Sequence, residues 1–590
     1  MKQFLITMAG VFAGLALFFV GVPFIVLSLV AAASHPAPTP ASSVLSLDLR
    51  SGVTDQEPQS VFSLFGSRNV AVMKVIATLR RAEGDDRIKG LFVRLPGAGM
   101  EPGEADELRA AFRHFHDHGK FIIAHSQGLY PEGMVTSTYM LGASADQLWM
   151  QPGAPFQVTG IATQDIFFKG FFDKYGITPD FQQRYEYKNA VNSYLDTDYT
   201  PAHREAELSW MGSIYDSALA AAAADRKMDP AKLKTLIEAG PYDAEDAKAK
   251  GLIDQLGTVK DAEQAAAARA GDGARMESLD DYASGLGGLD NGLGRPEVAV
   301  IGAEGEIDNA PSSDGLGKSQ TINSGDLAEA LYAAADDKDV KAIVFRESSP
   351  GGSDTASEEI LAAVRYAKTK KPIVVSMGTY GASGGYWIAS EASAIVAEPT
   401  TLTGSIGVFG GKLVVGPALA RFGVNLRQLS VGGQYAGADD ASAPFTPTQR
   451  AAFAASVDHV YDGFISRVSQ GRRIPADRVR EIARGRVWTG AQAKPLGLID
   501  QVGGFYDAVD RAKALAGLSG QDVRLKPVTA KHSPLEAIRR AFGVTESSLH
   551  TLAEVGEVLS DPHARDLIDA VADDRRRASG DLVLAPVPRF

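Results

Sequence analysis

The chain has 590 residues, which is too long for a single hydrophobic core and typical of two or three domains. Its content of 45% hydrophobic and 22% charged residues is ordinary for a globular protein, and its net charge of −13 argues against a nucleic acid partner, which requires a basic face. The absence of cysteine excludes disulfides and thiolate metal sites, but it is compatible with either cytoplasm or periplasm.

The N-terminal segment predicts a membrane span. No charged residue lies between Phe4 and Ala33, and about 20 apolar residues suffice to cross a bilayer. Lys2 precedes this segment, so the positive-inside rule places the chain after it outside the cytoplasm. A cleaved signal peptide is the alternative, but its apolar region is usually only about 7–15 residues long. We therefore expect an uncleaved anchor and a proline-containing tether over residues 1–43.

The rest of the chain contains an internal duplication. The sequence Gly-Leu-Ile-Asp-Gln-Leu-Gly at 251–257 recurs as Gly-Leu-Ile-Asp-Gln-Val-Gly at 497–503, an offset of 497 − 251 = 246 residues. A repeat of this length indicates a duplicated domain rather than a solenoid, whose units run ~20–50 residues. The predicted division is a first repeat over 44–270, a linker over 271–296, a second repeat over 297–519 and a tail over 520–590.

Alternating strand and helix patterns predict an α/β fold for the repeats. In the second repeat, short apolar runs indicate buried strands at 298–301, 342–345, 373–376 and 394–396. Helical periodicity lies between them at 327–335, 358–369 and 383–391. Strands that alternate with helices imply βαβ units and largely parallel pairing.

A serine lies at one predicted strand-to-helix junction. Ser383 belongs to the sequence Gly-Ala-Ser-Gly-Gly at 381–385, where unpaired backbone N–H groups converge at the start of a helix. Such a serine can attack a carbonyl while the amide of Gly384 faces the developing oxyanion. Taken alone, the motif also fits an ordinary helix-capping serine. The turn Ser-Pro-Gly-Gly at 349–352 follows another strand, and its glycine amides would supply the second oxyanion donor.

A serine nucleophile needs a base, and the sequence indicates a lysine. No histidine lies near the serine motif, and His114, His116 and His118 fit a solvated helix end better than a metal site, because no second ligand cluster accompanies them. Lys188 lies among aromatic and aliphatic residues, so burial would lower its pKa. The matching segment of the second repeat, 435–438, lacks the lysine, and the first repeat lacks the serine motif. We therefore expect one shared site between the repeats.

Four motifs carry a family resemblance: Ser349-Pro-Gly-Gly-Ser353, Gly381-Ala-Ser-Gly-Gly-Tyr-Trp387, Leu402-Thr-Gly-Ser-Ile-Gly-Val408 and Val487-Trp-Thr-Gly490. With the anchor and the lysine segment, they make the chain resemble the signal peptide peptidase A (SppA) family in its long, tandemly duplicated, membrane-anchored bacterial form. The resemblance covers most of the chain. It implies tandem Clp-protease/crotonase-like domains behind one N-terminal transmembrane helix.

The resemblance also implies roles for individual residues. Ser383 matches the nucleophile, Lys188 the general base and Ser405 the serine that orients the lysine. The expected oxyanion donors are Gly351, Gly352 and Gly384, and no metal or cofactor is expected. Two positions depart from the family pattern: Ser348 replaces an asparagine, and Asn192-Ser193 replaces an acidic residue and a proline. Both flank the key residues and bear on substrate preference more than on catalysis.

The leading hypothesis is a serine endopeptidase that degrades cleaved signal peptides and other unfolded hydrophobic peptides. By resemblance it would be a homotetramer in the bacterial inner membrane, in contact with its lipid and with the catalytic domains on the periplasmic side. A crotonase-like acyl-CoA enzyme and an inactive membrane scaffold on the same fold are the alternatives. The first usually acts through carboxylates, and the second leaves the serine, the lysine and the Ser-Pro-Gly-Gly turn without a role.

Overall fold

The computed structural model describes residues 14, 39–57, 69–286, 294–309 and 321–530. The predicted anchor at 4–33, apart from residue 14, and the tail from 531 lie outside the described residues. No helix within the described ranges is both long and apolar enough to span a bilayer. The described residues of both repeats belong to one compact unit.

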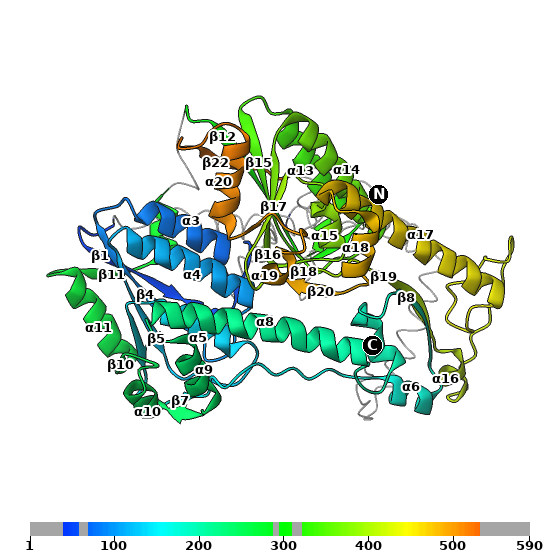
Figure 1. Cartoon of the computed structure of the whole chain (residues 1–590), viewed down its shortest axis with the longest axis horizontal. Helices are drawn as coiled ribbons and strands as arrows, with labels where there is room; N and C mark the ends of the chain where they lie inside the picture. The colour runs from blue at the N-terminus through cyan, green and yellow to red at the C-terminus, as the bar shows by residue number, and fades with distance from the viewer. Residues whose placement is uncertain (1–13, 15–38, 58–68, 287–293, 310–320, 531–590) are drawn as a thin grey trace. The chain divides into compact units, whose positions relative to one another are not determined.

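The first repeat is built on a six-stranded parallel sheet in the order β10-β6-β5-β4-β1-β11 (Figure 1). Its strands are β1 Ser43–Asp48, β4 Ile88–Arg94, β5 Phe121–Ser126, β6 Gln147–Met150, β10 Gln255–Leu256 and β11 Arg275–Ser278. Its helices are α3 Val72–Ala82, α4 Pro102–Asp117, α5 Val135–Ala143, α8 Pro201–Asp225, α9 Pro230–Glu238, α10 Ala244–Ala249, α11 Val259–Ala270 and α12 Leu279–Gly285.

The second repeat is built on an eight-stranded sheet in the order β20-β18-β16-β15-β12-β22, with β17 added beside β16 and β21 beside β17. Its strands are β12 Glu297–Glu304, β15 Val340–Ser349, β16 Ile373–Ala382, β17 Ala394–Ala397, β18 Leu402–Gly404, β20 Val487–Thr489, β21 Gln501–Val502 and β22 Arg524–Pro527. Its helices are α13 Ser324–Asp336, α14 Asp354–Lys370, α15 Gly384–Ala389, α17 Pro447–Arg472, α18 Ala476–Ile482, α19 Gly490–Ala493 and α20 Phe505–Leu515.

The predicted α/β character of the second repeat is confirmed, since a strand or helix lies at each predicted position and only β20 pairs antiparallel among the strands of its sheet. β16 is longer than expected and runs on to Ala382. Its first half pairs with β17, and its second half, from Tyr380, pairs with β18. Gly378 and Thr379 interrupt the apolar pattern of the sequence, so the strand was expected to end there. In the structure they lie where β16 changes from pairing with β17 to pairing with β18. This extension carries the chain to Ser383.

Each repeat ends later than its composition indicated. β11 pairs with β1 and β22 pairs with β12, so both sheets are completed by a strand that lies beyond the predicted ends at 270 and 519. The two strands are 524 − 275 = 249 residues apart, which agrees with the duplication. Because the composition around β11 is rich in Gly and Asp, this short edge strand was not predicted. Much of the predicted linker therefore belongs to the first repeat.

Two features join the repeats. β8, Thr178–Arg184 of the first repeat, pairs antiparallel with β19, Val408–Val414 of the second, along its whole length. One hydrophobic core is continuous from the first sheet to a face of the second sheet and to α20, whereas a second core fills the opposite face under α13, α14 and α17. The remaining elements are short: β2 Val53–Thr54, β3 Val70–Ala71, β7 Pro155–Phe156, β9 Tyr242–Asp243, β13 Glu306–Asp308, β14 Thr321–Asn323, α6 Lys169–Tyr175, α7 Asn192–Leu195 and α16 Gly416–Ala420.

Candidate active site

Ser383 lies between the end of β16 and the start of α15. Its backbone has φ 53° and ψ −116°, a conformation that is costly for a residue with a side chain. The amide of Ser383 donates to the carbonyl of Gly404 at 2.9 Å, which holds the turn against β18. The side chain makes no helix-capping hydrogen bond. The ordinary capping interpretation of the motif is therefore wrong, and the hydroxyl has another partner.

That partner is Lys188. Its Nζ lies 2.9 Å from Ser383 Oγ, 2.9 Å from Ser405 Oγ and 3.1 Å from the carbonyl oxygen of Ser405. Lys188 is only 5% exposed and follows β8, so it reaches the second repeat beside the β8–β19 pairing. The structure thus brings together the serine of one repeat and the lysine of the other, as the sequence asymmetry predicts.

The lysine segment is fixed by the second repeat. The amides of Tyr185 and Tyr187 both donate to the carbonyl of Arg484 at 3.2 Å. Gly485 has φ 83°, and a Cβ atom there would lie 2.5 Å from the backbone nitrogen of Lys188. Only glycine permits that close approach. The position of Lys188 therefore depends on backbone contacts as well as on the partners of its Nζ.

The surroundings of Lys188 change its protonation. Burial lowers the pKa of Lys188 from 10.5 to about 7, because the ammonium form loses hydration and gains no charged partner in exchange. Its neighbours are hydroxyls and a carbonyl, which bind the amine without adding a negative charge. A neutral amine is thus available near neutral pH to accept a proton from Ser383.

The Ser-Pro-Gly-Gly turn lies directly against the serine. A Cβ atom on Gly351 would lie 2.7 Å from Ser383 Cβ, and one on Gly352 would lie 2.1 Å from the carbonyl oxygen of Ile307, so neither position accepts a side chain. The amide of Gly351 donates to Ser349 Oγ at 3.2 Å. Because the Gly351 amide already has this acceptor, the amides of Gly352 and Gly384 are the two predicted oxyanion donors that remain.

The corresponding place in the first repeat has a similar backbone arrangement without the serine. The amide of Gly99 donates to the carbonyl of Glu132 at 2.7 Å, and a Cβ atom on Gly99 would lie 2.1 Å from the backbone nitrogen of Met134. Two backbone segments therefore approach each other closely here, as the Ser-Pro-Gly-Gly turn and Ser383 do in the second repeat. The missing serine leaves the first repeat without a matching nucleophile.

A cavity of about 320 Å³ adjoins Ser383 and Lys188. Its apolar wall is formed mainly by α15 and α17, through Trp387, Phe453, Val457, Val460 and Phe464. The contribution of α17 to this wall was not predicted from the sequence. The spacing 453, 457, 460 and 464 is a helical stripe, but a stripe of that kind predicts a buried face and not what the face encloses.

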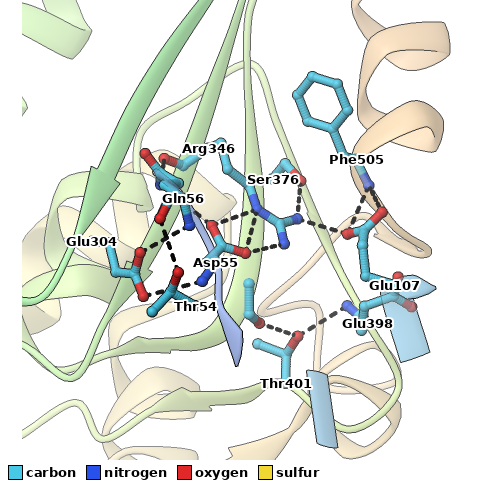
Figure 2. A network of polar contacts seen from close by, with 11 residues as sticks. Thr54, Asp55, Gln56, Glu107, Glu304, Arg346, Ser376, Glu398, Thr401 and Phe505 are labelled. Carbon is cyan, nitrogen blue, oxygen red and sulfur yellow. Dashed lines mark hydrogen bonds and ion pairs between the residues drawn. The ribbon is translucent and has the colours of Figure 1, made fainter. Parts of the chain in front are cut away.

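A buried charge network ties the first repeat to the strand before the Ser-Pro-Gly-Gly turn (Figure 2). Arg346 on β15 is 1% exposed, and its guanidinium contacts Asp55 and Glu107, both from the first repeat. Glu107 Oε2 lies 2.8 Å from Arg346 Nη1, and Ser376 Oγ accepts a further bond from the same nitrogen at 3.0 Å. Sequence analysis gave no sign of this network, because its members are far apart along the chain.

The chain is similar to known peptidases along most of its length. The sequence pattern of Peptidase family S49 matches residues 126–272 and 365–519, one segment in each repeat. The chain is 32% identical to Protease 4 of Salmonella typhi over 464 residues, which is 76% of this chain and 72% of that protein. It is 30% identical to Protease 4 of Haemophilus influenzae over 76% of this chain and 73% of that protein. Serine protease SPPA, chloroplastic, of Arabidopsis thaliana is 30% identical over 81% of this chain and 69% of its own length.

Proposed function

Since the chain belongs to peptidase family S49 and is a serine-type peptidase, we propose that it is a membrane-anchored endopeptidase with a Ser–Lys dyad. Its substrates are cleaved signal peptides and other unfolded hydrophobic peptides. The observation that carries the proposal is the 2.9 Å distance between Lys188 Nζ and Ser383 Oγ.

In the proposed reaction, neutral Lys188 takes the proton of Ser383 as Oγ attacks the scissile carbonyl carbon. The amides of Gly352 and Gly384 stabilise the oxyanion of the tetrahedral intermediate. Lys188 then returns the proton to the leaving amine, and the peptide C–N bond breaks to give an ester on Ser383. Lys188 next takes a proton from water, whose oxygen attacks the ester carbonyl; the bond from the acyl carbon to Oγ breaks, the acid product leaves, and Lys188 returns the proton to Ser383 Oγ. Ser405 orients Lys188 through its hydroxyl and its carbonyl oxygen.

The proposed substrate class follows from the cavity. Its wall of Trp387, Val457, Val460 and Phe464 favours an apolar side chain beside the scissile bond. The glycine-rich turns at 351–352 and 404–407 leave room for an extended backbone to pair as an added strand. Folded proteins cannot present such a strand to the cavity, so we expect them to be poor substrates.

The proposed location rests on the sequence of residues 4–33. Anchored in the inner membrane through this apolar segment, the catalytic repeats would lie on the periplasmic side, where released signal peptides are accessible from the bilayer. We expect a reporter enzyme that is active only in the periplasm to be active when it is fused after Ala41, and a reporter that is active only in the cytoplasm to be inactive there. Activity of a cytoplasmic reporter at that position would contradict the topology and the substrate class with it.

The proposed homotetramer is supported by an unpaired segment. β8 pairs with β19, and the repeat offset of 435 − 187 = 248 residues places the second-repeat counterpart of β8 at 426–432. Leu429 and Val431 in that segment are each 100% exposed. A second copy of the chain would cover them by repeating the strand pairing between subunits. Light scattering should give four subunits for the wild type and fewer for Leu429→Asp with Val431→Asp; a wild-type monomer would rule the assembly out.

The activity is tested with a fluorophosphonate probe, which labels activated serines. We expect labelling of the wild type at Ser383 and none in Ser383→Ala. The second arm compares turnover of an apolar signal peptide, a folded protein and an acyl-CoA thioester, and the peptide should be preferred. Preference for the thioester would instead favour a crotonase-like enzyme, and lack of labelling together with lack of turnover would favour an inactive scaffold.

A further inference from the structure

The C-terminal ends of α3 and α4 lie side by side in the first repeat (Figure 1). Glu83 follows α3, His114 lies in the last turn of α4, and His118 follows that helix. Each offers one metal-ligating atom, and these atoms all lie within 4.8 Å of one another. His114 Nδ1 is 2.7 Å from Glu83 Oε1.

From the sequence, the histidines fitted a solvated helix end better than a metal site, because no further ligand accompanied them. The structure supplies a further ligand. The missing ligand is Glu83, which comes from a different helix, 31 residues upstream of His114. His114 and His118 are four residues apart, and their rings stack with centroids 4.5 Å apart. The stacking places both imidazoles on the same side of the C-terminal end of α4. His116 does not share the cluster, since its Nε2 lies 3.0 Å from Asp146.

We propose that Glu83, His114 and His118 form a zinc-binding site separate from the catalytic centre. Two imidazoles and one carboxylate are ligands that Zn²⁺ accepts, with water in the fourth position. His118 Nδ1 contacts the carbonyl of His114 at 2.8 Å, and an N–H donated there leaves Nε2 free as a ligand. The ligand atoms of a tetrahedral zinc ion are about 3.4 Å apart, so modest rotation of these side chains completes the site.

The cluster already attracts a cation. The guanidinium of Arg80 contacts both ring nitrogens of His114, with Nη1 2.9 Å from Nδ1. Zinc would displace this guanidinium, which keeps a second interaction because its Cζ lies 5.0 Å from the ring centroid of Tyr506. Arg80 is therefore a competitor for the site, and its removal should strengthen zinc binding.

A zinc ion here would hold the ends of α3 and α4 together. α4 also supplies Glu107 to the buried network around Arg346, so the ion would stabilise a helix that joins the two repeats. None of the three ligands lines the cavity beside Ser383 and Lys188. We therefore expect an effect on stability and not on the chemical step.

The test is isothermal titration of ZnCl₂ into the chelator-treated full chain, with Co²⁺ absorption as a spectroscopic probe of tetrahedral ligation. We expect one ion per chain in the wild type, in Ser383→Ala and in the matched control His116→Ala. His118→Ala and Glu83→Gln should bind at least about tenfold more weakly, because each loses one ligand. Arg80→Ala should bind more tightly, and zinc should raise the melting temperature only in proteins that retain the three ligands.

Two outcomes would overturn the site. Equal zinc affinity in His118→Ala and the wild type would show that the ion binds elsewhere. Equal weakening by His116→Ala and His118→Ala would show only nonspecific binding by surface histidines. Neither outcome bears on the Ser–Lys dyad, since labelling of Ser383 is measured without zinc.

Discussion

Ser383 and Ser405, the two serines that contact Lys188, both have positive backbone φ angles, of 53° and 49°. Such conformations cost about 1–3 kcal/mol for a residue with a side chain. Each is held by a backbone bond: Ser383 donates to the carbonyl of Gly404, and Ser405 donates to that of Arg486. The result is that both hydroxyls converge on one amine. Fixed geometry of this kind is what the proposed proton transfer from Ser383 to Lys188 requires in its transition state.

The lowered pKa of Lys188 predicts the pH dependence of peptide hydrolysis. Below pH 7 the amine is protonated and cannot act as a base, so kcat/KM should fall about tenfold for each pH unit below 7 and level off above it. Initial rates on an unfolded apolar peptide from pH 5 to 9 measure this profile. A rate that is constant from pH 5 to 8 would contradict Lys188 as the base.

Glu347 on β15 has a different, unfavourable environment. Its side chain is 0% exposed, and both carboxyl oxygens lack a hydrogen-bond partner among the described residues. Burial raises its pKa well above 4.5. The folded protein therefore holds this proton to higher pH than the unfolded chain does, and the free energy of unfolding falls as the pH rises above about 4.5.

Glu347→Met should therefore stabilise the protein. It removes an unpaired buried polar group at similar volume, and we expect a gain of about 1–3 kcal/mol in the free energy of unfolding. The gain should be larger at pH 8 than at pH 5, measured by urea denaturation. Glu306→Met, at an exposed strand position, is the control and should have little effect. A destabilised Glu347→Met would mean that the carboxyl has a partner the contacts do not reveal.

At the scale of elements, β8 and the strand β15 connect the repeats in two ways. β8 delivers Lys188 through main-chain pairing with β19. β15 ends in the Ser-Pro-Gly-Gly turn and carries Arg346, whose ion pairs within the described residues are with Asp55 and Glu107 of the first repeat. A buried arginine without its acids would be an uncompensated charge, so folding of the second sheet is coupled to the presence of the first.

Asp55→Asn tests that coupling. It keeps the shape of Asp55 but leaves Arg346 with a single acidic partner, Glu107, and we expect a loss of about 3–5 kcal/mol in the free energy of unfolding. Glu481→Gln is the matched control, because its pair with Arg478 is exposed on both sides and should be worth less than about 1 kcal/mol. Equal effects of the two substitutions, measured by denaturant unfolding, would mean that the buried network does not join the repeats.

Some strands were predicted from the sequence, and others were not. Strands such as β12 and β17 are continuous apolar runs, and these are confirmed. The later part of β16 and the strand β11 were missed, because polar residues can form a strand when a neighbouring strand pairs with them. The pairing of β8 with β19 could not be predicted from the sequence either, because antiparallel pairing between distant segments leaves no periodic signal in either segment.

At the scale of the whole molecule, the duplication was the strongest predictor of the site. The loss of the serine motif from one repeat and of the lysine from the other indicated a shared site before any contact was known. The 2.9 Å approach of Lys188 Nζ to Ser383 Oγ agrees with that expectation. Contacts such as Arg346 with Asp55, or the lining of the cavity by α17, depend on tertiary packing of segments that carry no matching motif.

In the proposed mechanism, a lysine from the first repeat activates a serine of the second. The most direct test is kcat/KM for an unfolded apolar peptide at pH 8 in Lys188→Ala, compared with the wild type, Ser383→Ala and the double variant. We expect each single variant to lose about 10³-fold or more, and the double variant to be no worse, because the two residues act as a unit. Hydrolysis by folded Lys188→Ala within about tenfold of the wild type would contradict the claim.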